Sequence, residues 1–192
     1  MFATLAGYLI AIRGSDCKFL WSARSVEYSS NIAVADLDDD GFPEIVGTQD
    51  DAVIVFDRKG NVLAKAARKG WSNSPLIRRF EAGGPPLIVL ERSVFKYSSA
   101  HGLIAVRLDP SDATKFFSVS VVADLESGGP SLITGARIYE GMTGVDMSPS
   151  ELTMFSGASD SLPVVADLNG DGRPDLWNVR FRAGEVWVWF SP

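Results

Sequence analysis

The chain has 192 residues, of which 46% are hydrophobic and 22% are charged, which is typical of a globular domain and excludes a disordered one. Its net charge of −6 argues against the basic surface that nucleic acids and anionic membranes attract. Cys17 is the only cysteine, which excludes an intrachain disulfide. No apolar run reaches the roughly 20 residues that span a bilayer.

Read in chain order, the sequence predicts short strands. Met1–Ile12 is apolar, but it lacks a basic segment and is interrupted by Gly7 and Tyr8, so we interpret it as strand and not as a signal peptide. If the protein is exported, we expect its signal outside this chain. β-branched runs separated by Gly, Asp and Asn turns then predict four strands, at 32–36, 44–48, 52–57 and 62–65.

Four similar segments recur along the chain. Their shared prolines are Pro43, Pro85, Pro130 and Pro174, at steps of 42, 45 and 44 residues. Four short antiparallel strands in a period of about 40–45 residues form the blade of a β-propeller. The sequence therefore predicts an all-β fold in which residues 1–192 are one propeller domain or segment, with blade boundaries near residues 30, 74, 118 and 162.

The two ends of the chain fall inside blades. Shifting the first repeat back by 43 residues places Phe2 on Ile45, so the first predicted blade begins at its second strand. The last blade ends after its third strand, at 185–190. We therefore expect a piece of a larger propeller, or a chain that needs a partner to close. A small closed ring of four blades is the alternative.

Two acidic loops follow the first strand of their blades and carry oxygen ligands at positions 1, 3, 5, 7 and 9. In the first loop these are Asp36, Asp38, Asp40, the backbone carbonyl of Phe42, and Glu44; in the second they are Asp167, Asn169, Asp171, the carbonyl of Arg173, and Asp175. Ca²⁺ takes six to eight hard oxygen ligands, and glycine at position 6 permits a sharp turn. The pattern predicts two Ca²⁺ ions.

Two other interpretations of these loops have to be weighed. An EF-hand requires a bidentate Glu at position 12, but Gly47 and Asn178 stand there. Loops of Asp, Asn and Gly also form turns without any metal. The middle copies have lost most ligands: one keeps Asp124 and Glu126, and the other keeps Glu81. We therefore expect the ions to reinforce individual blades, without a catalytic role.

The segment 34–46, Val-Ala-Asp-Leu-Asp-Asp-Asp-Gly-Phe-Pro-Glu-Ile-Val, resembles the FG-GAP/VCBS repeat of integrin α-subunits and of many secreted proteins. The resemblance is specific at 36–46 and 167–176 and weak in the middle copies. It implies propeller blades, one Ca²⁺ in each intact loop, and an extracellular or cell-surface role in adhesion, carbohydrate binding or scaffolding. Some large propellers of similar repeats are polysaccharide lyases, so the resemblance also leaves room for an enzyme.

The remaining candidate residues support binding more than catalysis. His101, the only histidine, lies in a predicted hairpin turn without a visible partner. Trp187 and Trp189 alternate along one strand and share a face, where they either pack between blades or form a platform for sugars. We expect a non-catalytic propeller that binds a protein or a glycan. The alternative is a fragment of a carbohydrate-active enzyme, for which Glu140, Asp146 and Glu151 are the available acids.

Overall fold

The structure is a computed structural model that describes residues 2–5, 7–24, 31–49, 51–68, 74–108, 120–125, 129–134, 137–150, 163–180 and 185–190. The described strands form five antiparallel sheets. In chain order the sheets are β1 (Phe2–Leu5), β2 (Tyr8–Ile12), β3 (Phe19–Arg24); β4 (Ala33–Ala35), β5 (Glu44–Gln49), β6 (Ala52–Phe56), β7 (Val62–Ala67); β8 (Leu76–Arg78), β9 (Leu87–Leu90), β10 (Ser93–Ser98), β11 (Gly102–Arg107); β12 (Ser120–Ala123), β13 (Ser131–Thr134), β14 (Arg137–Glu140); and β15 (Val164–Ala166), β16 (Asp175–Arg180), β17 (Glu185–Trp189).

The predicted fold class is confirmed, because each sheet is a small antiparallel meander of three or four strands in sequence order. The four strands predicted for the first repeat correspond to β4–β7. The predicted strand at the N-terminus is two strands joined at Gly7, whose φ of 82° is easily adopted only by glycine. In the third repeat, the described residues after β14 contribute an isolated bridge between Tyr139 and Asp146 at the place of the fourth strand. Of the expected blade boundaries, those near 30, 118 and 162 lie outside the described residues.

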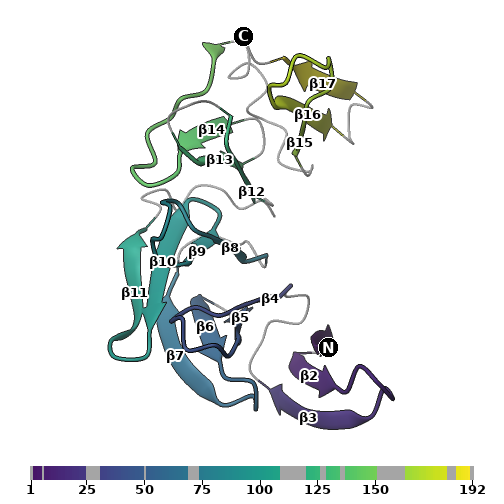
Figure 1. The fold of residues 1–192 in the computed structure, drawn as a ribbon, viewed down its shortest axis with the longest axis vertical. Coiled ribbons are helices and arrows are strands. Elements are labelled where there is room, and N and C mark those ends of the chain that lie inside the picture. The colour runs from purple at the N-terminus through teal and green to yellow at the C-terminus, as the bar shows by residue number, and fades with distance from the viewer. Residues whose placement is uncertain are drawn as a thin grey trace.

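The sheets follow one another along an open arc, with β1–β3 at one end and β15–β17 at the other (Figure 1). The first strand of each middle sheet lies on the inner side of the arc, where β4 contacts β8 and β8 contacts β12. The last strands lie on the outer side, where β7 contacts β11. The loops that follow the first strands, including both acidic loops, therefore start from the inner part of each sheet.

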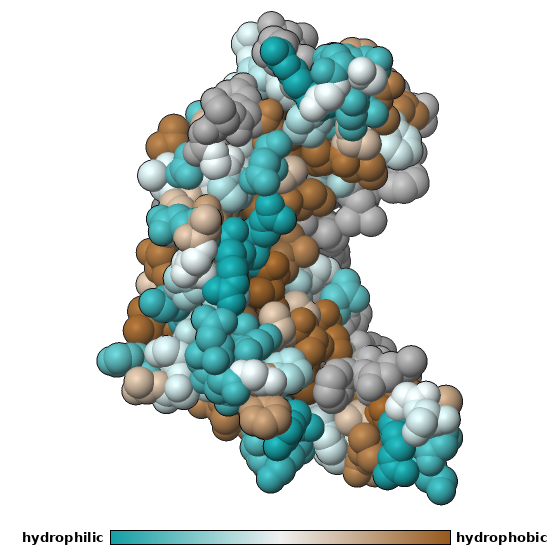
Figure 2. All heavy atoms as spheres, viewed as in Figure 1, coloured by the Kyte–Doolittle hydropathy of each residue, from teal (hydrophilic) through white to brown (hydrophobic). Residues whose placement is uncertain are grey.

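Hydrophobic cores lie between successive sheets, because alternate residues of a strand point to opposite faces. In β5, Ile45 packs with Leu9 of the preceding sheet, and Val46 packs with Ile88 of the following sheet. Figure 2 shows hydrophobic residues in bands between the sheets, and the hollow side that the arc encloses. No helix of sufficient length and apolarity to cross a membrane is found among the described residues.

Candidate metal centre

The first acidic loop is fixed at both ends by the ladder between β4 and β5, in which Ala35 pairs with Glu44. Inside the loop, Asp39 has a φ of 60° and Gly41 has a φ of 87°. Left-handed backbone is adopted readily by glycine and tolerated by aspartate, because the short polar side chain can form local hydrogen bonds. These two residues turn the chain sharply and bring the alternate side chains of the loop together.

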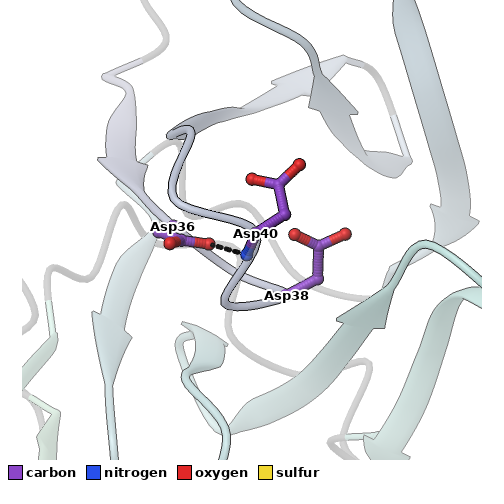
Figure 3. A group of neighbouring side chains, drawn as sticks. All are labelled: Asp36, Asp38 and Asp40. Carbon is purple, nitrogen blue, oxygen red and sulfur yellow. Dashed lines mark hydrogen bonds between the residues drawn. The ribbon is translucent and has the colours of Figure 1, made fainter.

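The turn gathers three carboxylates at positions 1, 3 and 5. One oxygen from each of Asp36, Asp38 and Asp40 lies within 4.8 Å of the others (Figure 3). Backbone N–H groups orient two of them: Asp40 and Gly41 donate to the two oxygens of Asp36 at 3.1 and 2.9 Å, and the Phe42 N–H donates to Asp40 Oδ1 at 2.7 Å. Three like charges at this separation repel one another unless a cation balances them.

Asp38 and Glu44 are acids of the loop with buried oxygens. Asp38 Oδ1 is buried and has no hydrogen-bond partner among the described residues. Glu44 is buried, and its pKa is raised by that burial and by the charges of Asp38, Asp40 and Asp36, although the Leu37 N–H donates to its Oε2 at 2.8 Å and lowers it. A divalent cation would stabilise the ionised form of every one of these groups.

The second acidic loop repeats the backbone arrangement of the first. The Gly172 N–H donates to Asp167 Oδ2 at 2.9 Å, and the Arg173 N–H donates to Asp171 Oδ1 at 2.8 Å. The Leu168 N–H donates to Asp175 Oδ2 at 2.8 Å, the counterpart of the bond from Leu37 to Glu44. Gly170 and Gly172 have φ values of 80° and 87°.

Position 3 distinguishes the two loops. It is Asn169 in the second loop, and its Nδ2 donates to Asp171 Oδ2 at 2.9 Å. The second loop therefore places one negative charge fewer around the same centre. Within the described residues, the group of three acids is found at the first loop. The two loops thus share their backbone hydrogen bonds and differ in charge.

Arginines that the sequence analysis did not single out lie beside the first loop. Arg79 forms an ion pair with Asp39 at 2.5 Å, and Arg58 lies over the ring of Phe42, with its Cζ 4.1 Å from the centroid. The loops of the second and third repeats are one residue shorter, so the count from Pro130 back to Asp124, applied to Pro85, places Arg79 where the first ligand would stand. This alignment was the sequence signal that could have identified Arg79. A hollow of about 460 Å³ beside Asp36 is lined by Ala35, Asp36, Ile77, Arg78, Arg79 and Pro86.

The loop of the third repeat, which has lost most of its ligands, is also contacted by an arginine. Asp124, its remaining ligand at position 1, forms an ion pair with Arg78 of the preceding sheet at 2.9 Å. Glu126 lies outside the described residues. In the second repeat, Glu81 is exposed, and its carbonyl accepts a bond from the Gly84 N–H.

The other candidate residues are distributed along the arc. Trp189 packs in the core between the last two sheets, beside Ile133, Ile138 and Leu176. The backbone of Trp187 pairs with Asn178, and its side chain is outside the described set. His101 lies in the turn between β10 and β11, as expected, with its Nδ1 3.4 Å from Ser98 Oγ.

The acids considered for catalysis are engaged in local contacts. Glu140 accepts hydrogen bonds from the Met142 and Thr143 N–H groups at 3.2 and 2.5 Å. Asp146 forms an ion pair with Arg137 at 2.7 Å. Glu151 lies outside the described residues.

No family model and no curated protein matches this chain. Solved structures do match. The biofilm matrix protein Bap1 of V. cholerae matches with a TM-score of 0.62 and 24% identity, over 90% of this chain and 28% of its own. BamB from Moraxella catarrhalis matches with a TM-score of 0.46 and 16% identity, over 97% of this chain and 56% of its own. The chain thus spans little more than a quarter of Bap1, and at 24% identity that likeness is one of fold.

Proposed function

We propose that this chain is a Ca²⁺-stabilised, non-catalytic β-propeller scaffold that binds a protein or a glycan outside the cell. The observation that carries the proposal is the first loop, where three carboxylates converge and a buried Asp38 oxygen has no hydrogen-bond partner among the described residues. Carboxylate and carbonyl oxygens in a flexible loop are the ligands that Ca²⁺ prefers, whereas Mg²⁺ demands stricter octahedral geometry.

We assign the first ion to Asp36, Asp38, Asp40, the Phe42 carbonyl and Glu44. The second ion belongs to Asp167, Asn169, Asp171, the Arg173 carbonyl and Asp175. The matching hydrogen bonds in the two loops support one coordination scheme for both. With one carboxylate replaced by an amide, the second site is the weaker one, because ligand charge tunes Ca²⁺ affinity. Each ion would hold the corner between the first and second strands of its own blade.

Two features support binding over catalysis. His101 lies in an exposed turn, and both Glu140 and Asp146 accept hydrogen bonds from their own loop. The fold resembles part of Bap1, which is described as a biofilm matrix protein, and this favours an extracellular place for the scaffold. We propose that the ligand binds to an aromatic platform on β17 that includes Trp187, while Trp189 also packs in the core. We also propose that the scaffold joins further blades, from a second copy or from a longer propeller.

Calorimetric titration of the EDTA-treated chain with CaCl₂ tests the metal sites. We expect two ions per chain, with the second loop binding more weakly. Asp38→Ala should leave one ion, on the Asp167 loop, because distant sites act independently. Asp51→Asn, an exposed acid outside both loops, should leave two. A stoichiometry of zero or four, or loss of both ions in Asp38→Ala, would contradict the assignment.

A further inference from the structure

The second, third and fourth sheets each pack on the next one through a repeated pair of apolar residues from their second and third strands. The paired residues are direct neighbours in the antiparallel register, and all are at most 4% exposed. These pairs are Val46 with Val55, Val89 with Val94, and Ile133 with Ile138. Each lies in a core shared with the sheet that follows. We call the face that carries this pair the forward face of a sheet.

The last sheet carries the same pair on its forward face. Trp177 pairs with Val188 across β16 and β17, and Val164 of β15 lies on the other side of Trp177. Three valines on this face are open to solvent, since Val188 is 44% exposed, Val164 is 40% exposed and Val186 is 59% exposed, and Trp177 is half-buried. A group of exposed apolar residues on one sheet face marks an interaction surface.

The opposite face of a sheet, its rear face, has its own repeated pair. Ile45 pairs with Phe56, Ile88 pairs with Phe95, and Leu132 pairs with Tyr139. Each pair packs against the sheet that precedes it.

The rear face of the first sheet is apolar and has solvent-exposed side chains. Ile10 and Ile12 are half-buried, whereas Tyr8 is 39% exposed and Phe19 is 63% exposed. The chain thus presents a forward face at one end of the arc and a rear face at the other (Figure 1).

We propose that the forward face of β15–β17 binds the rear face of β1–β3 in a second copy of this chain. The inference deepens the proposed joining of further blades, and it does not depend on calcium. Its basis is continuity with the junctions inside the chain, where every forward face of this kind is covered by a rear face. Contact between two different faces is heterologous, so it links copies head to tail.

Sedimentation velocity of the full chain over a range of concentrations tests this proposal. We expect the mass to rise with concentration, and Val188→Glu to weaken association at least about tenfold, because a charge is costly to bury in an apolar contact. Phe19→Glu, on the other face, should have the same effect. Val62→Glu is the matched control, since Val62 is 52% exposed on β7 and belongs to neither terminal face.

Mixing the two variants gives the sharpest result. Val188→Glu keeps its rear face and Phe19→Glu keeps its forward face, so together they should form a dimer that does not extend, while each alone stays monomeric. A wild-type monomer at all concentrations would overturn the proposal, as would equal effects of Val188→Glu and Val62→Glu. Calcium stoichiometry measured on the same variants should stay at two ions, which separates failure of this interface from failure of the metal sites.

Discussion

Replacing Asp38 by Asn should change stability in opposite directions with and without calcium. Asp38 Oδ1 is buried without a hydrogen-bond partner, and the carboxylate lies within 4.8 Å of oxygens from Asp36 and Asp40. Two like charges at about 5 Å repel by about 1 kcal/mol in water and by about 3 kcal/mol at the effective dielectric of a protein surface. Because the loop is partly exposed, we expect the lower figure. Without calcium, Asp38→Asn should therefore stabilise the chain by about 1 kcal/mol.

With calcium we expect the sign to reverse, because the same carboxylate is a ligand in the proposed site. A site at a hundredfold excess of free Ca²⁺ over its dissociation constant stabilises the folded state by about 2.7 kcal/mol. Asp38→Asn should lose most of this contribution while the second loop keeps its own. The substitution should also lower the pKa of Glu44, because Asp38 is the leading charge among the three that raise it.

Urea unfolding in EDTA and in millimolar CaCl₂ measures both effects. Asp51→Asn removes one exposed negative charge outside the loops and should change stability little in either buffer. If Asp38→Asn destabilises the chain in EDTA as much as in calcium, the side chain supports the loop structurally, and the argument from unbalanced charge is wrong.

Two further predictions concern packing and ligand binding. Gly60→Ala should cost about 2–4 kcal/mol in urea unfolding, because Gly60 has a φ of 84° and a Cβ there would lie 2.7 Å from the Trp21 ring. Gly83→Ala, at a φ of 74° with open space around it, should cost about 1–2 kcal/mol. Equal costs would mean that the Trp21 ring moves aside without a loss of stability. Trp187→Ala should weaken binding to immobilised alginate or dextran in biolayer interferometry, and unchanged binding would rule out the platform for these two polymers. Trp189→Ala should lower stability, because Trp189 packs in the core between the last two sheets.

The local structure of the blades was predictable, because it depends on residues close in sequence. The expected strands at 44–48 and 52–57 are β5 and β6, and the acidic loops form between the first and second strands of their sheets. The contacts between blades were harder to predict. The pair between Arg79 and Asp39 joins residues 40 positions apart, so it requires the spacing of neighbouring sheets as well as the repeat length.

Trp187 and Trp189 were the residues for which the sequence left two roles open, packing or a sugar platform. The third-strand positions Phe56, Phe95, Tyr139 and Trp189 are all aromatic, and in each of these sheets that residue pairs with an apolar residue of the second strand. This pattern was present in the repeat and favours packing for Trp189. No sequence signal predicted that a terminal sheet face is exposed. A strand whose face packs on a neighbouring sheet and a strand whose face does not have the same alternation of side chains.

The loops of the second and third repeats show how the turn between the first and second strands of a blade forms without the acidic ligand set. In the second repeat, Arg79 replaces the first ligand, and its guanidinium binds Asp39 of the adjacent acidic loop and the Gly84 carbonyl of its own. In the third repeat, Asp124 keeps its charge and receives Arg78. An arginine of the chain and, in the proposed function, a bound divalent cation would be two ways to place positive charge at the inner end of a blade. Only the bound cation would make the stability of the blade depend on the calcium concentration. The two intact loops lie in the second sheet and in the last sheet. Calcium would therefore stabilise the sheets on either side of the third and fourth sheets, whose loops are contacted by Arg79 and Arg78.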